Sequence, residues 1–126
     1  MEKDFGFFLF NIIYNLIYSC LQKIRSLIMK VNIEVLSGPT DGETHSFRSS
    51  FEIGRDQNSP LPLSLDKFVS RHHARIHIYD SDCVLEDLNS TNGTFVDNRR
   101  LPGSEKVNLS SGQIFRVGRT WLQISW

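Results

Sequence analysis

Short runs of alternating apolar and polar residues, separated by turn-forming residues, fill the sequence from residue 31 to its end. In residues 73–80, Ala74, Ile76 and Ile78 alternate with mostly polar side chains, which is the two-residue period of a half-buried strand. Glycine, proline, asparagine or aspartate interrupts such runs about every eight to twelve residues. No segment after residue 30 keeps a helical period. The pattern predicts an all-β sandwich of roughly ten short strands, with functional residues in its loops.

The positions of the strands follow from the same alternation. We expect strands at residues 31–36, 44–47, 51–54, 73–80, 83–88, 93–96, 99–101, 106–109, 112–118 and 120–126. The segment 55–65 contains two prolines and is expected to form a loop. A chain of 126 residues is long enough to bury one hydrophobic core.

The N-terminal segment has a different composition. Residues 5–21 are dominated by large apolar side chains, and a basic stretch follows them. We therefore expect an apolar or amphipathic helical segment over residues 1–29, in front of a β domain of residues 30–126. Three interpretations of this segment are open: a transmembrane helix, an amphipathic helix on a membrane or partner surface, or a segment outside the working protein because translation starts at Met29.

Polar residues within the apolar run bear on these interpretations. A transmembrane helix normally needs about 20 apolar residues, and this run is slightly shorter. Asn11, Asn15 and Ser19 recur at every fourth position, as on one face of an amphipathic helix. The absence of a basic start and of a small-residue cleavage site argues against a secretory signal. Membrane contact through residues 5–28 would leave the β domain on the cytoplasmic side, because basic residues follow the run.

The charge and cysteine content narrow the functional classes. The chain has 14 basic and 14 acidic residues, so its formal net charge is zero and no nucleic-acid partner is expected. Anion binding would therefore need a local arrangement of donors. The two cysteines, Cys20 and Cys83, have neither metal-site nor disulfide spacing. Two free thiols fit a reducing compartment, so we expect a cytoplasmic protein.

The histidines do not form a pattern that predicts catalysis or metal binding. In a strand, His73 and His77 lie on one face whereas His72 points to the other, and a zinc site needs three or four converging ligands. The sequence also lacks a nucleophile elbow and a phosphate-binding glycine loop. We expect no enzyme activity, no metal and no cofactor.

Three expected loops carry polar and basic residues. Arg55 follows Gly54 at the end of a strand, and a Thr-Asn-Gly sequence occupies residues 91–93. Ser70 and Arg71 precede another strand. Each has a simpler interpretation: a solvated arginine, a turn-capping serine and an Asn-Gly hairpin turn. Together they predict an anion cradle, because a phosphate monoester presents about two negative charges and three acceptor oxygens to guanidinium, hydroxyl and amide donors.

These motifs, in this order, resemble the forkhead-associated (FHA) domain, a phosphothreonine-binding module. The family pattern is Gly-Arg, then Ser-x-x-His, then Asn-Gly, and here it reads Gly54-Arg55, Ser70 to His73, and Asn92-Gly93. The likeness covers residues 31–126. It implies an FHA-like β-sandwich of about eleven short strands.

The resemblance implies a role for each residue of the phosphopeptide-binding site. Arg55 is expected to contact the phosphate, Ser70 to donate its hydroxyl to a phosphate oxygen, and Arg71 to occupy the next contact position. Thr91 is expected to help receive the phosphothreonine. Asn92 is expected to bind the peptide backbone beside it.

Other residues are implied to shape the site or to select the peptide. Gly54 and Gly93 are expected to permit turns, and His73 to brace the loops without touching phosphate. Phe68 occupies the family position that helps read the third residue after the phosphothreonine, with Lys67 beside it. Phe68 favours an apolar residue there, whereas Lys67 would favour an acidic one.

A second Gly-Arg pair precedes the last strand and could be mistaken for the phosphate site. Only Arg55 stands upstream of the Ser-x-x-His motif at the family's spacing, so Arg119 is expected to be a solvated turn residue.

The sequence thus predicts a phosphothreonine-binding adaptor that acts in signal transduction downstream of a Ser/Thr kinase, with phosphorylated proteins as partners. The alternative is an FHA-like structural or assembly element without phospho-dependent binding, held at a membrane by its N-terminal segment. A purely structural copy need not retain the complete set of pocket residues.

Overall fold

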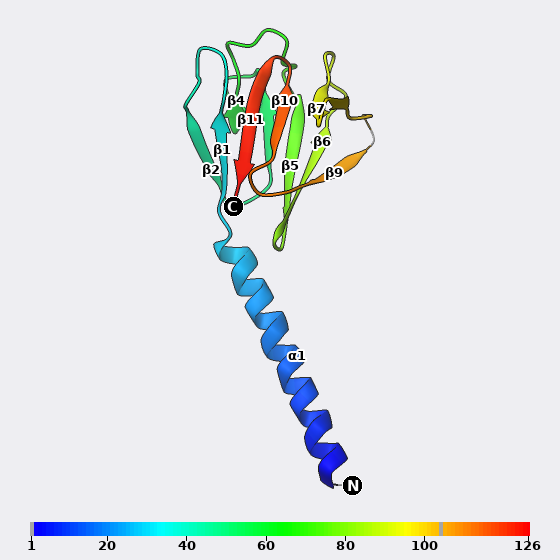
Figure 1. Cartoon of the computed structure of the whole chain (residues 1–126). Helices are drawn as coiled ribbons and strands as arrows, with labels where there is room; N and C mark the ends of the chain where they lie inside the picture. The colour runs from blue at the N-terminus through cyan, green and yellow to red at the C-terminus, as the bar shows by residue number, and fades with distance from the viewer. Residues whose placement is uncertain (1, 104) are drawn as a thin grey trace.

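The computed structural model describes residues 2–103 and 105–126, with the side chains of residues 2–4 and 25–28 excepted. One helix, α1 (Glu2–Ile28), precedes eleven strands that form two packed sheets. The fold is an all-β sandwich with a single N-terminal helix, as the sequence predicts. Figure 1 shows α1 extending away from one end of the sandwich.

The two sheets bring together strands that are far apart in the sequence. The six-stranded sheet has the order β2 (Thr44–Phe47), β1 (Val31–Val35), β11 (Thr120–Ser125), β10 (Ile114–Val117), β7 (Thr94–Val96) and β8 (Arg99–Arg100). The five-stranded sheet has the order β4 (Leu61–Pro62), β3 (Phe51–Gly54), β5 (Ala74–Tyr79), β6 (Asp82–Asp87) and β9 (Lys106–Leu109). Among the strand pairs of the described residues, only β3–β4 is parallel.

The core lies between the sheets and is built by the alternation seen in the sequence. In β1, the side chains of Val31, Ile33 and Val35 are fully buried, whereas Glu34 is exposed. Phe115 is the largest fully buried side chain. Each large aliphatic or aromatic side chain buried here contributes about 1.5–3 kcal/mol through removal from water. The start of the sandwich is held by Met29, which packs against this core.

One strand lies where the sequence predicted only loop. Leu61 and Pro62 form the two-residue strand β4, which pairs with β3 at the edge of the five-stranded sheet. Proline has no N–H to donate. It is tolerated in an edge strand because the N–H at such a position can face away from the sheet, where no ladder hydrogen bond is lost. The next residue, Leu63, donates its N–H to the Gly54 carbonyl at 2.8 Å.

The interpretation of Asn92-Gly93 as a hairpin turn is wrong. β6 belongs to the five-stranded sheet and β7 to the six-stranded sheet, so residues 88–93 cross from one sheet to the other. The chain instead makes a tight two-residue turn at Asp97-Asn98, between β7 and β8. Both residues have positive φ, 52° and 61°, as a type I′ turn requires. The local preference of Asn-Gly for tight turns did not reveal which sheet each flanking strand joins.

Candidate functional site

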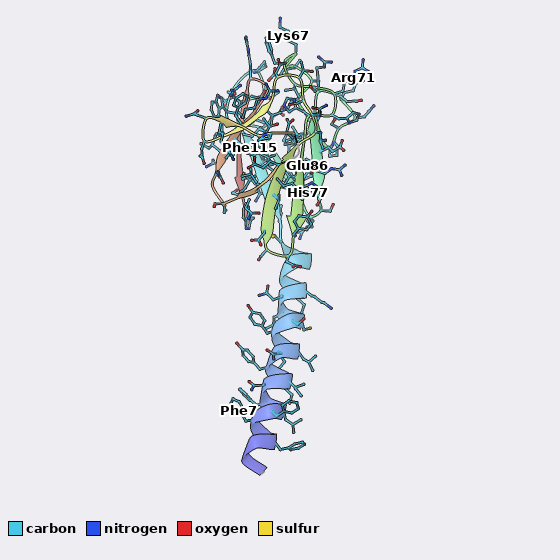
Figure 2. The ribbon with its side chains drawn as sticks, turned by 90° about the vertical axis from the view of Figure 1, so that its right-hand side faces the viewer. Phe7, Lys67, Arg71, His77, Glu86 and Phe115 are labelled. Atoms are coloured by element: carbon cyan, nitrogen blue, oxygen red, sulfur yellow. The ribbon has the colours of Figure 1, made fainter. Side chains whose placement is uncertain are left out.

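The β3–β4, β4–β5 and β6–β7 loops meet at one end of the sandwich, and hydrogen bonds join them. This end lies opposite α1 (Figure 1). Figure 2 shows Lys67 and Arg71 of the β4–β5 loop there. We call these three segments the site loops, residues 55–60, 63–73 and 88–93.

Arg55 begins the first site loop and is held against the second. Its N–H donates to the Ser70 carbonyl at 2.9 Å, and its Nη1 donates to the Lys67 carbonyl at 3.4 Å. The residue before it, Gly54, has no room for a side chain, because a Cβ there would lie 1.9 Å from the Arg71 carbonyl oxygen. Glycine is therefore required for Arg55 to start so close to the second loop.

Ser70 joins all three site loops. Its carbonyl accepts from Arg55, and its Oγ accepts the Thr91 N–H at 3.1 Å. Its own N–H donates to Nδ1 of His73 at 2.9 Å. A hydroxyl has one donor and two acceptor lone pairs, so the Thr91 bond leaves the Ser70 O–H available for a ligand oxygen.

His73 is fully buried and bridges the second and third site loops. Nδ1 accepts from Ser70 and Nε2 donates to the Gly93 carbonyl at 2.9 Å, which fixes the neutral tautomer. Burial lowers the pKa of His73 below its usual value, while the bond to Gly93 and the charge of Asp87 act in the opposite sense. His73 is thus a neutral connector between two backbones.

The third site loop is also tied to the second by Asn92. Its Nδ2 donates to the Phe68 carbonyl at 2.9 Å, which uses one of its two amide hydrogens. Thr91 and Asn92 are both exposed at the rim. Gly93 has φ of 91°, in the left-handed region where glycine is favoured.

A buried polar cluster under the third site loop was missed from the sequence. Asp87 accepts hydrogen bonds from the Ser90 N–H at 3.0 Å, from the Ser90 hydroxyl and from the Thr94 hydroxyl at 2.7 Å. The Ser90 Oγ in turn accepts from Gly93 N–H at 3.0 Å. The sequence signal was an aspartate at a strand end followed three residues later by serine, which is typical of a side-chain-closed turn.

Arg119 is an exposed turn residue, as the sequence predicts, but it also lies against the second site loop. It belongs to the β10–β11 turn, and its guanidinium carbon lies 3.8 Å from the centroid of the Phe68 ring. Lys67 Nζ lies 5.8 Å from the same centroid. The Phe68 surface, expected to be apolar, is therefore covered by cations.

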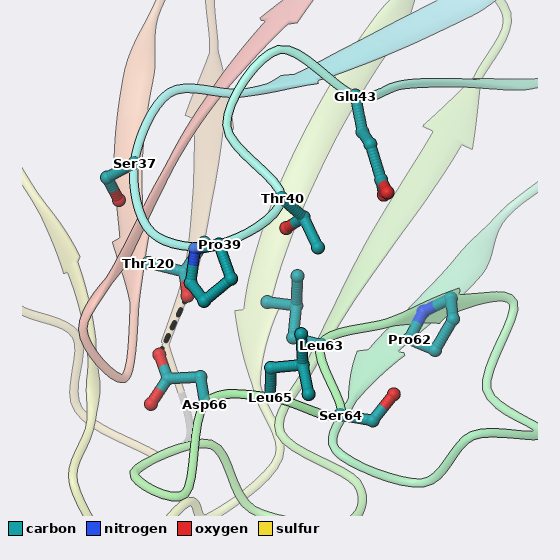
Figure 3. A pocket seen from close by; sticks show the side chains of 10 residues that line it. All are labelled: Ser37, Pro39, Thr40, Glu43, Pro62, Leu63, Ser64, Leu65, Asp66 and Thr120. Carbon is teal, nitrogen blue, oxygen red and sulfur yellow. Dashed lines mark hydrogen bonds between the residues drawn. The ribbon is translucent and has the colours of Figure 1, made fainter.

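Asp66 holds the β10–β11 turn beside the second site loop. It accepts the N–H groups of Phe68 and Arg119, each at 2.9 Å, and the Thr120 hydroxyl at 2.7 Å. Figure 3 shows the Asp66–Thr120 bond at the rim of a neighbouring hollow of about 210 Å³. This arrangement makes Arg119 part of the same end of the molecule, which sequence spacing alone did not reveal.

The structure thus brings Arg55, Ser70, Thr91 and Asn92 to one place. Arg71 is exposed on the same loop. A further cation missed by sequence reasoning lies close by, since Arg100 Nη2 donates to the Thr91 carbonyl at 3.4 Å. Among the described residues, no His, Cys, Asp and Glu side chains are grouped so as to hold a metal ion.

Arginine, hydroxyl and amide donors, held together on a β-sandwich by hydrogen bonds among its loops, form a module that can bind an anionic ligand. The chain belongs to the FHA domain family, whose model matches residues 51–118. The family resemblance deduced from the sequence and the FHA-like sandwich fold are therefore confirmed.

Individual relatives agree with this assignment. FhaB of Mycobacterium tuberculosis is 36% identical over 72 residues, which cover 57% of this chain and 44% of FhaB. The Arabidopsis thaliana FHA protein At4g14490 is 28% identical over 85 residues, 66% of this chain and 22% of that protein. The chain thus spans less than half the length of these curated relatives.

Solved FHA structures share the fold. An FHA domain studied for phosphothreonine-dependent interactions has a TM-score of 0.68 and 32% identity, with 78% of this chain and 97% of that chain covered. The FhaA FHA domain, solved in complex with the intracellular domain of Rv3910, has a TM-score of 0.65 and 34% identity, with 75% and 98% covered.

Proposed function

We propose that this protein binds phosphothreonine peptides through the site loops and acts as an adaptor for proteins phosphorylated by a Ser/Thr kinase. One observation carries the proposal. Arg55, the Ser70 hydroxyl and the exposed Thr91-Asn92 pair, which come from three separate loops, are assembled at one place by bonds through Ser70 and His73. Such a set supplies the charge and the donors that a phosphate needs.

Each proposed contact has a chemical basis in the local geometry. The Arg55 guanidinium has further N–H donors besides the one that binds the Lys67 carbonyl at 3.4 Å. A guanidinium can bind a phosphate through two parallel hydrogen bonds. The Ser70 O–H is free to donate because its oxygen already accepts from Thr91. Arg71, exposed beside them, adds a second cation. Asn92, with its second amide hydrogen and carbonyl, would bind the peptide backbone.

The relatives support the same proposal through what they bind. One solved FHA domain was studied for phosphothreonine-dependent interactions. EmbR of Mycobacterium tuberculosis, which shares 25% identity over the matched region, was solved in complex with a low-affinity phosphopeptide. The alternative, a structural or assembly element, would not need Arg55, Ser70 and Asn92 to be retained together.

Titration of the full chain with a phosphothreonine peptide tests the proposal. The phosphorylated peptide should shift the backbone amide signals of residues 55, 70, 71, 91 and 92, and the unphosphorylated peptide should not. Equal shifts from both peptides, or no shift from either, would favour the structural alternative.

Arg55→Ala provides the matching variant test. Hydrogen bonds to charged groups contribute about 1.5–3 kcal/mol each, so losing two should weaken binding by about 100-fold or more. Arg99→Ala is the control, because Arg99 is an exposed arginine paired with Glu105 at 3.1 Å rather than with a site loop. Arg99→Ala should bind within about twofold of the wild type. An Arg55→Ala affinity within threefold of the wild type would contradict the role of Arg55.

A further inference from the structure

The surface of α1 over residues 5–24 is mostly apolar, and it is not packed against any other part of the chain that the structure describes. The large apolar side chains of residues 5–24 are each between 40% and 68% exposed, and none of this stretch is buried. Figure 2 shows side chains extending from α1 on more than one side, below the sandwich. A helix that belonged to the core of a soluble domain would bury one face, so this helix needs an apolar environment from outside the chain.

The length of the apolar part matches a lipid bilayer. Residues 5–24 make 20 residues of helix, which at about 1.5 Å per residue extend about 30 Å. The hydrocarbon core of a bilayer is about 30 Å thick. From Phe5 to Gln22 there is no charged side chain.

The polar residues form a narrow stripe instead of a broad polar face. Asn11, Asn15 and Ser19 are four residues apart, so successive members advance by about 40° and the stripe covers an arc of about 80°. Phe8 falls inside the same arc, seven residues before Asn15. A helix lying on a membrane surface carries a wide face rich in charge, which this stretch lacks. A stripe of amide side chains inside lipid instead marks a contact between helices.

The charges at the two ends of α1 are unequal. Lys23 lies at the C-terminal end of residues 5–24 and Arg25 and Lys30 follow it, whereas Glu2 and Asp4 offset the single Lys3 before Phe5. Basic residues favour the cytoplasmic side of a span, which is the side of the sandwich here. The site loops lie at the end of the sandwich remote from α1 (Figure 1), so a bilayer around α1 would leave them open to ligand.

We propose that α1 spans a membrane and pairs there with α1 of a second copy through the Asn11–Asn15–Ser19 stripe. The sandwich then stands on the cytoplasmic face with its site loops directed away from the lipid. This proposal does not depend on phosphopeptide binding, and its test measures membrane insertion instead.

The spanning part is tested on the full chain by extracting membranes of expressing cells with alkaline carbonate, which releases surface-bound proteins. The wild type should stay in the membrane pellet. Leu16→Lys and Asn15→Lys should both be lost from it, because each places a charge near the middle of the span. Asn15→Leu is the control and should stay in the pellet.

Asn15→Lys separates spanning from lying on the surface. Asn15 would face water in a surface helix, so its lysine variant would then remain in the membrane as the wild type does, while Leu16→Lys would be lost. That pattern, or release of the wild type by carbonate, would overturn the proposal.

The pairing part is tested by disulfide formation in the membrane. Cys20 lies five residues after Asn15, about 140° away around the helix, and the other thiol, Cys83, is fully buried in the sandwich. The full chain with Asn15→Cys and Cys20→Ser should form a disulfide dimer on oxidation at least several-fold more than the wild type. Equal cross-linking of the two chains, or none in either, would overturn pairing through the stripe.

Discussion

Replacing His73 by alanine should unfold the sandwich at a markedly lower temperature. The change removes both partners that His73 provides, so the Ser70 N–H and the Gly93 carbonyl lose their hydrogen bonds at a fully buried position. Each buried group without a hydrogen bond lowers the free energy of unfolding by about 1–3 kcal/mol. For the two groups together we take about 3 kcal/mol, which lies in the lower half of the possible range. For a domain of this size, about 1 kcal/mol changes Tm by 4–8 °C. We therefore expect Tm to fall by at least about 12 °C.

Tryptophan fluorescence of the full chain measures this change in the sandwich alone, because both tryptophans, Trp121 and Trp126, lie in or after β11. His72→Ala is the control, since the adjacent His72 side chain is 68% exposed, and its Tm should stay within about 4 °C of the wild type. If His73→Ala melts within that range too, the bridging role of His73 is refuted. Unchanged melting with lost peptide binding would place His73 against the ligand.

Acid should reduce the contribution of His73 to the free energy of unfolding. The folded pKa of His73 is lowered mainly by burial, so its contribution to stability is complete above the unfolded pKa of about 6.5. The contribution decreases as pH falls below that value, because only the unfolded state binds the proton, and it is lost once the folded pKa is passed. Between pH 7 and 5 the free energy of unfolding should fall more steeply in the wild type than in His73→Gln. Parallel curves would show that His73 does not titrate differently in the two states.

The remaining predictions concern the loop backbone and peptide selection. Gly54→Ala should lower both Tm and phosphopeptide affinity, because its Cβ would meet the Arg71 carbonyl at 1.9 Å and force the two loops apart; an unchanged Tm would show that the loops can separate freely. A peptide with Asp at the third position after the phosphothreonine should bind up to about fivefold more tightly than one with Ile, because Arg119 covers Phe68 and an exposed ion pair contributes up to about 1 kcal/mol. Arg119→Ala should reduce that preference, and tighter binding of the Ile peptide to the wild type would restore the apolar expectation.

The fold and the motif residues could be predicted because their signals are local. Alternation placed the buried side chains of β1 and β5 correctly, since a period of two depends only on neighbouring residues. The Gly-Arg, Ser-x-x-His and Asn-Gly motifs were readable for the same reason. The residues that the structure brings together, Arg55 and Ser70, are the ones those motifs contain.

What the sequence missed depends on contacts between distant segments. The crossing of residues 88–93 between sheets depends on which strands β6 and β7 pair with, and the Asn-Gly dipeptide carries no such information. The approach of Arg119 to Phe68 likewise depends on Asp66. This side chain accepts hydrogen bonds from Arg119 and Thr120, which follow it by 53 and 54 positions in the sequence. Only the tertiary structure could supply these contacts.

The connections among the site loops bear on how tightly a ligand can bind. Ordering a loop on binding reduces the affinity that its contacts would otherwise give. Here the three loops are already joined, since Ser70 contacts Arg55, Thr91 and His73 through its carbonyl, hydroxyl and N–H. Most of the conformational entropy of these loops is therefore lost when the domain folds, and little remains to be lost when a ligand binds. In the proposed function the same hydroxyl also donates to the ligand, so Ser70→Ala should lose both the Thr91 bond and the phosphate contact.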